Sequence, residues 1–294
     1  MPSVISLKLP PFKFQIETDI STVANNLQTL YPDAQRLDSA TQKESEEFID
    51  YNLKLIQGGG LRKWVKGQAR FLCDYREPFK PLNASQAFAM LEWGMNWTIA
   101  AHEMQYVIVH AGILAKNGRA VLFPAPPGSG KSTLTAHLAF NGWQLLSDEM
   151  ALIDPITHRV IPFVRPICLK NSSIDLAKKW FPNGCFSTVA TDTHKGDVIH
   201  LSPPDVSWQM ATQSAEIKGV VFPNYRANQA LQIYQLSQAE TFMQLAENAF
   251  NFQVLGLQGF DTVVKVVENA KCFEIFHNDL HEVQAFLEED VISD

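Results

Sequence analysis

The chain has few cysteines and no long apolar run. Its 294 residues include four cysteines, none of them in a C-x-x-C pair, which disfavours both a disulfide framework and a zinc knuckle. No stretch reaches the roughly 18 uninterrupted apolar residues of a membrane-spanning helix, and the N-terminus lacks the basic-then-apolar pattern of a secretion signal. We therefore expect a cytoplasmic protein without a membrane partner.

Positive charge is also scarce. Lys and Arg together number 24 against 31 Asp and Glu, and the formal net charge is −7 at pH 7. A nucleic-acid partner needs a basic face that neutralises many phosphates, so this balance argues against such a partner. It is compatible with a local basic site that holds a single nucleotide.

One segment has the pattern of a phosphate-binding loop. Residues 123–133 read FPAPPGSGKST and match the end of the G-x-x-x-x-G-K-[ST] template, in which backbone N–H groups and the lysine hold phosphates and the hydroxyl coordinates Mg²⁺. Ala125 replaces the first glycine of the template, which alanine tolerates where φ is negative. An apolar strand before the loop and a helix from about Lys131 to Phe140 supply the expected context. The predicted nucleotide-binding residues are Gly128, Ser129, Gly130, Lys131, Ser132 and Thr133.

Two adjacent acids follow the next expected strand, WQLLS. The strand–helix–strand unit around the loop predicts a right-handed crossover and parallel strands. The carboxyl ends of such strands share the sheet edge at which ligands bind, which brings Asp148 and Glu149 close to the phosphates. One acid can hold Mg²⁺ together with Ser132 and the other can accept a proton from an attacking hydroxyl. A turn or a helix cap is the structural alternative for this pair.

A histidine is aligned with the same loop by an expected hairpin. Asn117-Gly118 lies between two apolar runs and favours a type I′ turn, which requires positive φ at both central residues. The resulting register places His110 opposite Ala125. There it can contact the γ-phosphate or the incoming acceptor, and a hydrogen-bonded strand histidine is the alternative reading.

These residues carry a resemblance to a known family. The segment VHAGILAKNGRAVLFPAPPGSGKSTLTAHLAFNGWQLLSDEMALID resembles the core of the HPr kinase/phosphorylase family, in which His110, Lys131 and Ser132 match family positions. The resemblance implies ATP and Mg²⁺ as cofactors. It also implies that Asp148 is the base that activates a hydroxyl and that Glu149 helps to bind the metal. Thr133 departs from the family, which has an acid at that position.

Three later segments are similar to the divergent HPr-kinase-related group A: RPICLKNSSI, THKGDVIHLSPP and FPNYR. This similarity implies a dedicated protein, peptide or small-molecule acceptor, with PqqD-like and nucleotidyltransferase-like partners. Relatives of this fold often assemble, so a homo-oligomer is a further expectation. Arg165 is a candidate to stabilise the transferring charge, Lys195 to contact phosphate or substrate, and Arg226 to flank the nucleotide. A solvated loop lysine is the alternative reading for Lys195, and a structural arginine for Arg165.

The resemblance predicts an α/β fold with two parts. Residues 81–294 are expected to form a P-loop core with a mixed sheet, related to phosphoenolpyruvate carboxykinase, and residues 1–80 a small N-terminal α+β region of unknown role. The expected function is an ATP-dependent kinase that transfers the γ-phosphoryl to a serine-type hydroxyl. The alternatives are a nucleotide-sensing module without catalysis, which Thr133 motivates, and an NTPase or phosphatase that uses water. Asp148 discriminates between them, because a binding module does not need a base.

Overall fold

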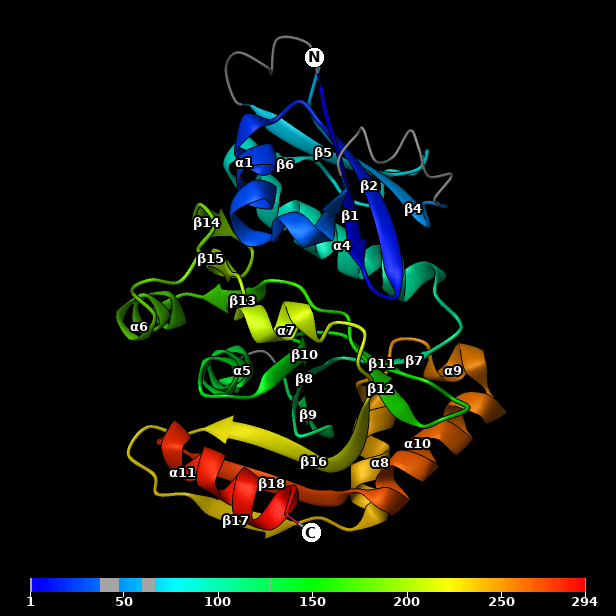
Figure 1. The fold of residues 1–294 in the computed structure, drawn as a ribbon, viewed down its shortest axis with the longest axis vertical. Coiled ribbons are helices and arrows are strands. Elements are labelled where there is room, and N and C mark those ends of the chain that lie inside the picture. Colours follow the sequence, from blue (N-terminus) through cyan, green and yellow to red (C-terminus); the bar gives the residue numbers. More distant parts are fainter. Residues whose placement is uncertain (1, 38–47, 60–66, 127, 294) are drawn as a thin grey trace. The chain divides into compact units, whose positions relative to one another are not determined.

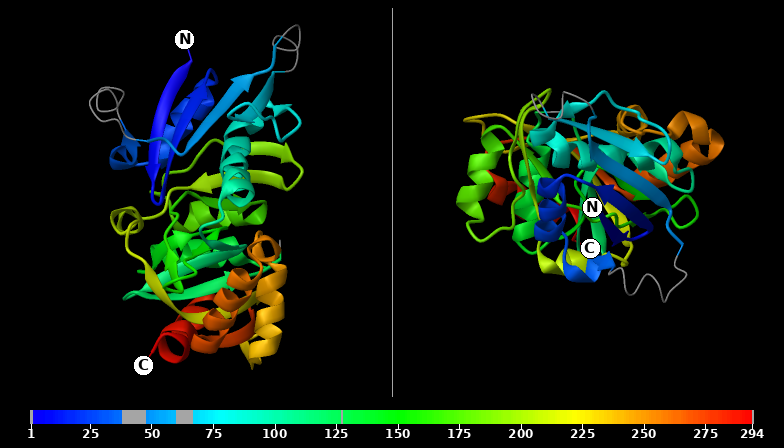
Figure 2. Two further views of the ribbon diagram at one scale, coloured as in Figure 1. Left: turned by 90° about the vertical axis from the view of Figure 1, so that its right-hand side faces the viewer. Right: turned by 90° about the horizontal axis from the view of Figure 1, so that it is seen from above.

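The computed structural model describes residues 2–37, 48–59, 67–126 and 128–293. The chain forms two compact units, each of them built from two stretches of sequence. Unit 1 contains Met1–His102 and Arg165–Ser202, and unit 2 contains Glu103–Val164 and Pro203–Asp294. Figures 1 and 2 show the elements of both units as mixtures of helices and strands.

Unit 1 has a six-stranded sheet in the order β3-β1-β2-β4-β5-β6 and a three-stranded sheet in the order β13-β15-β14. Its elements are β1 (Ser3–Leu9), β2 (Phe12–Thr18), α1 (Ser21–Leu30), η1 (Asp33–Gln35), β3 (Arg36–Leu37), β4 (Tyr51–Gln57), β5 (Gln68–Cys73), β6 (Leu82–Asn83), η2 (Ala84–Gln86), α4 (Ala87–His102), β13 (Ile167–Lys170), α6 (Ser172–Trp180), β14 (Ala190–Thr193) and β15 (Gly196–Leu201).

The helix α4 links the two stretches of sequence that make up unit 1. The helix is buried on most of its circumference, so it needs apolar partners on more than one side. It packs on β4, β5 and β6 of the larger sheet and also on β14 and β15 of the smaller one. The segment Arg165–Ser202 therefore belongs with the N-terminal part of the chain, although it is distant in sequence.

Unit 2 is built on a nine-stranded mixed sheet whose main path is β10-β8-β9-β16-β12-β11-β7, with β18 joined to β16 and β17 to β18. Its elements are β7 (Val107–Val109), β8 (Ala111–Lys116), β9 (Arg119–Pro124), α5 (Lys131–Phe140), β10 (Gln144–Ser147), β11 (Ala151–Ile153), β12 (Arg159–Ile161), α7 (Asp205–Gln209), β16 (Ala215–Tyr225), β17 (Gln232–Gln235), α8 (Gln238–Glu247), α9 (Phe252–Leu255), α10 (Leu257–Asn269), β18 (Lys271–His277), α11 (Leu280–Phe286) and η3 (Leu287–Val291).

The hairpin and the parallel strands that the sequence predicts are both confirmed. Lys116 pairs with Arg119, and the two turn residues between them, Asn117 and Gly118, have φ values of 53° and 76°. β8 is antiparallel to β9 and also to β10, so β9 and β10 run parallel with β8 between them. The loop after β9 and the acids after β10 therefore lie at the same edge of the sheet.

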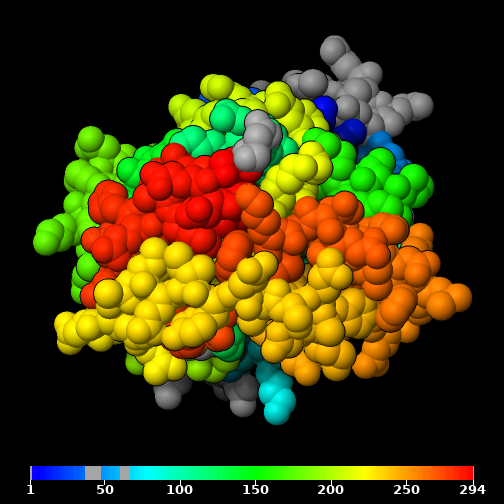
Figure 3. Space-filling view, turned by 90° about the horizontal axis from the view of Figure 1, so that it is seen from below, coloured from blue at the N-terminus to red at the C-terminus, as the bar shows by residue number. Residues whose placement is uncertain are grey.

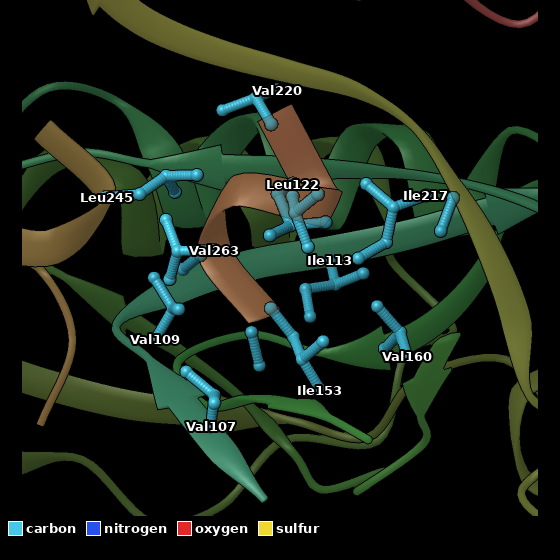
Figure 4. Close-up of a cluster of buried hydrophobic side chains, with 14 of the residues drawn as sticks. Val107, Val109, Ile113, Leu122, Ile153, Val160, Ile217, Val220, Leu245 and Val263 are labelled. Carbon is cyan, nitrogen blue, oxygen red and sulfur yellow. The ribbon is translucent and has the colours of Figure 1, made fainter. Parts of the chain in front are cut away.

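The two strands on either side of His110 belong to different ladders in the sheet of unit 2. β7 and β8 are joined by the single residue His110, yet β7 pairs with β11 at one end of the path and β8 pairs with β10 near the other. Apolar side chains on this sheet form a buried cluster (Figure 4). They come from the strands and from the helices α8 and α10, and include Val107, Ile113, Leu122, Ile153, Val160, Ile217, Leu245 and Val263.

The C-terminal elements cover an outer face of unit 2. Figure 3 shows this face, with α11 and η3 in red, the α9–α10 region in orange and the β17–α8 region in yellow. Within the part of the chain that the structure describes, no helix combines the length and the apolar character needed to cross a membrane.

Candidate functional site

The candidate phosphate loop ends in two glycines with left-handed backbone. Gly128 has a φ of 89° and Gly130 a φ of 88°, a region that glycine adopts without steric cost. The helix α5 begins at Lys131, directly after Gly130. Its first N–H groups have no partner within the helix and carry the positive end of the helix dipole, which suits an anion.

The alanine at the start of the loop is tolerated for the expected reason. The backbone at Ala125 does not adopt positive φ, so the missing glycine causes no strain there. The side chain is buried. Pro127 lies outside the described residues.

The histidine predicted to face the loop lies beside its lysine. The Nζ atom of Lys131 is 3.2 Å from Nε2 of His110. Because the lysine ammonium can only donate, Nε2 accepts, and this contact selects the tautomer whose hydrogen is on Nδ1. The backbone N–H of His110 donates to the carbonyl of Asn248 at 2.8 Å, and the ring lies 5.8 Å from the ring of Phe250. His110 is therefore held in place from both its backbone and its ring.

The hydroxyl of the loop and the first acid also meet. The Oγ atom of Ser132 donates to Oδ2 of Asp148 at 3.2 Å. Asp148 follows β10 directly and is only 5% exposed, whereas the neighbouring Glu149 is partly exposed. The structure thus brings Lys131, Ser132, His110 and Asp148 to one edge of the sheet. Their roles in phosphoryl transfer stay predictions.

The donor atoms at this edge suit Mg²⁺. A hydroxyl and a carboxylate are hard oxygen ligands, and adjacent ligands of octahedral Mg²⁺ are about 3.0 Å apart when each lies about 2.1 Å from the ion. The separation of 3.2 Å between Ser132 Oγ and Asp148 Oδ2 is close to that value. The described residues contain no group of three or more His, Cys, Asp or Glu side chains that could hold a metal. Mg²⁺ typically takes one or two carboxylates and completes its shell with water and phosphate oxygens.

A glycine that sequence reasoning did not single out makes room for this arrangement. A Cβ at Gly112 of β8 would lie 2.8 Å from Oγ1 of Thr135 and 3.5 Å from Cγ of Lys131. It would also lie 3.5 Å from the carbonyl oxygen of Asp148. A glycine inside an apolar strand often marks such a close approach, and this signal was available in the run HAGILA.

A second missed residue, Tyr225, touches the loop from the neighbouring strand. Its backbone N–H at the end of β16 donates to the carbonyl of Ser129 at 2.9 Å. A Cβ at Gly130 would lie 3.0 Å from the Cβ of Tyr225, so glycine is needed there for space as well as for φ. The buried Oγ of Ser129 has no hydrogen-bond partner among the described residues, and a bound phosphate would supply one.

Behind Tyr225 lies a histidine buried in the neutral form. His277 is 1% exposed, and neither of its ring nitrogens has a hydrogen-bond partner in the described part of the chain. Burial holds the pKa of His277 below its usual value of 6.5, because the charged imidazolium is poorly solvated there. As the pH falls from 6.5 toward the lowered pKa of His277, the unfolded chain therefore binds more protons than the folded chain.

We predict that the free energy of unfolding falls as pH drops below about 6.5, by up to about 1.4 kcal/mol per pH unit from His277 alone. The contribution that neutral His277 makes to the free energy of unfolding is fully present above pH 6.5, and it is lost as the pH falls toward the lowered pKa of this residue. Urea unfolding of His277→Gln at pH 5 to 8 should show a smaller slope than wild type. Equal slopes for wild type and His277→Gln would contradict this assignment.

Arg165 is part of a buried polar cluster in unit 1. Its Nη1 atom donates to Oε2 of Glu92 at 3.3 Å and to the backbone carbonyl of Glu92 at 3.1 Å, and its Nη2 atom donates to Asn96. Glu92 also accepts from the hydroxyl of Tyr31 at 2.7 Å. Burial, followed by the charge of Glu92, raises the pKa of Tyr31. These contacts give Arg165 a structural role, and its predicted part in phosphoryl transfer stays a prediction.

Lys195 also belongs to unit 1. Within the segment THKGD, the two-residue turn His194-Lys195 connects β14 to β15. The Nζ atom of Lys195 lies 5.5 Å from the centre of the Trp93 ring, within the range of a cation–π contact. Its predicted contact with phosphate or substrate stays a prediction.

Fold and geometry together define a mixed α/β protein in which glycines, a lysine, a hydroxyl and a carboxylate converge at the N-terminus of one helix. No protein-family model matches the chain, and no curated protein sequence matches it significantly.

Proposed function

We propose that unit 2 is an ATP- and Mg²⁺-dependent phosphotransferase that transfers the γ-phosphoryl group to a hydroxyl of serine type. The contact between Ser132 and Asp148 carries this proposal, because it joins the first turn of α5 to a buried carboxylate at the same sheet edge. The contact between Lys131 and His110 also supports the proposal, because it holds a positively charged group beside the loop. The resemblance of residues 109–154 to the HPr kinase/phosphorylase core points the same way.

The chemistry divides among a few groups. The first N–H groups of α5 and the ammonium of Lys131 bind the phosphates, while His110 orients that ammonium. Ser132, Asp148 and Glu149 would hold Mg²⁺, which would neutralise charge that develops on the phosphate oxygens. We assign Oδ1 of Asp148 to accept the proton of the acceptor hydroxyl. The acceptor oxygen then bonds to the γ-phosphorus as the bond to the β-phosphate oxygen breaks, and ADP leaves.

The acceptor in this proposal is a dedicated protein, peptide or small molecule. The test mixes the full chain with γ-labelled ATP, Mg²⁺ and candidate acceptors, among them PqqD-like and nucleotidyltransferase-like proteins. We expect label on an acceptor only in the presence of Mg²⁺, and we expect Lys131→Ala to abolish both binding and transfer. Tight ATP binding without transfer to any acceptor would overturn the kinase assignment. Rapid release of inorganic phosphate without an acceptor would instead indicate an NTPase.

A nucleotide-sensing module is the second candidate. Thr133 favours it, because the HPr kinase/phosphorylase family has an acid at that position. The two candidates predict different results for Asp148, since a sensor requires Lys131 and the loop but no base. Retained signalling to a partner in a variant without the Asp148 carboxylate would favour the sensor.

A further inference from the structure

We propose that Tyr225, flanked by Arg226, is the surface on which the base of the bound nucleotide stacks. The inference rests on the proposed function and names the donor more narrowly. The donor would be a nucleoside phosphate with an aromatic base, recognised by that base as well as by its phosphates. Inorganic pyrophosphate would then bind without using this surface.

Tyr225 is fixed to the candidate phosphate loop itself. Its backbone N–H donates to the carbonyl of Ser129 at 2.9 Å, and its Cβ would lie only 3.0 Å from a Cβ at Gly130. Gly130 is the last residue before α5, whose N-terminus is the proposed phosphate site. The side chain of Tyr225 therefore starts beside that site, where a base joined to the phosphates through a ribose can reach it.

The ring is exposed although its backbone is held. Tyr225 is 52% exposed, whereas its neighbours on β16 from Val220 to Phe222 are buried. Parallel pairing places it opposite His277, and the two rings lie 6.1 Å apart with their planes at 70°. An exposed aromatic ring at a fixed position can stack on a flat base without a large loss of side-chain freedom.

Arg226 adds a positively charged group next to this ring. Its backbone N–H donates to the carbonyl of His277 at 2.9 Å. Its guanidinium carbon lies 5.1 Å from the centre of the Phe276 ring, which holds the planar cation in place. The ends of β9 and β16 lie at one edge because these strands are parallel, and that edge is where ligands of such sheets bind. A ribose or a phosphate oxygen of the same nucleotide can contact this guanidinium.

The test compares two ligands that share phosphates but not a base. We would titrate wild type, Tyr225→Ala and Tyr225→Phe with ADP and with pyrophosphate, both in the presence of Mg²⁺, by calorimetry. Tyr225→Ala should weaken ADP binding about tenfold, the size of one lost aromatic–base stack, and leave pyrophosphate binding unchanged. Tyr225→Phe keeps the ring and should bind both ligands as wild type does. Tyr234→Ala removes a ring of similar exposure, 49%, from β17 and should change neither affinity.

Each other outcome has a distinct meaning. Equal ADP affinity for wild type and Tyr225→Ala would overturn the stacking surface. A parallel loss of ADP and pyrophosphate binding in Tyr225→Ala would also overturn it, since the residue would then only support the loop. Wild-type protein that binds pyrophosphate as tightly as ADP would overturn the inference while the phosphate site stands. Wild-type protein that binds neither ligand would overturn the proposed function itself.

Discussion

Asp148→Asn is expected to lower the rate of phosphoryl transfer by roughly a hundredfold or more, the size typical of lost general-base catalysis. The amide is nearly the same shape as the carboxylate, and its oxygen can still accept the hydrogen bond that Ser132 makes at 3.2 Å. It cannot take up a proton from the acceptor hydroxyl. ATP binding should therefore persist while transfer is lost, and single-turnover transfer of labelled phosphate together with ATP titration separates these two effects.

A second aspartate of unit 2 supplies the matched control. Asp154, in the turn between β11 and β12, accepts the backbone N–H of Ile156 at 2.8 Å, and an asparagine oxygen can do the same. Asp154→Asn should transfer phosphate at the wild-type rate. Unchanged transfer in Asp148→Asn would remove Asp148 from the role of base. Loss of ATP binding in that variant would show that the carboxylate mainly holds the metal.

The second large effect concerns stability. Glu92→Leu is expected to lower the free energy of unfolding by about 3–5 kcal/mol, because it leaves the charge of Arg165 buried without its carboxylate. The two side chains are only 4% and 9% exposed. The hydroxyl of Tyr31 would lose its acceptor in the same variant. Urea unfolding, followed by intrinsic fluorescence and circular dichroism, measures the change.

Two further variants test whether the unpaired charge of Arg165 causes this loss of stability. The double variant Glu92→Leu/Arg165→Met removes both charges and should recover much of the lost stability, since apolar pairs often replace buried ion pairs without cost. Glu77→Ala breaks the more exposed pair with Arg70 and should cost less than about 1 kcal/mol. Full stability of Glu92→Leu would contradict the structural role. If the double variant is stable but transfers phosphate far more slowly than wild type, Arg165 also acts in the reaction.

The parts of the site that lie close together in sequence were predictable. Asn117-Gly118 predicts its own turn because few other residues adopt two successive positive φ values, and the register of the hairpin follows from it. The loop and α5 follow from glycines, a lysine and an apolar strand within one short segment. The parallel direction of β10 follows from the strand–helix–strand connection between β9 and β10. These local rules were enough to bring Asp148 near Ser132 and His110 to the phosphate loop, but not to predict the contact of His110 with Lys131.

Contacts between distant segments were not predictable in this way. No spacing in the sequence indicates that Arg165 pairs with Glu92, or that the backbone of Tyr225 bonds to Ser129. Such contacts depend on which strands become neighbours in space, and one sequence constrains that choice weakly. The grouping of Arg165–Ser202 with the N-terminal part of the chain is a contact of this kind, because it depends on the burial of α4 against β14 and β15.

The single-residue joint at His110 has a consequence for how the site tolerates change. The strands on either side of it belong to different ladders, with Val109 paired to Ala151 and Ala111 paired to Pro124. Deleting or inserting one residue between 107 and 116 would shift one ladder against the other and turn the histidine to the opposite face. The two ladders therefore fix the length of this stretch, while His110 and Gly112 restrict the side chains within it.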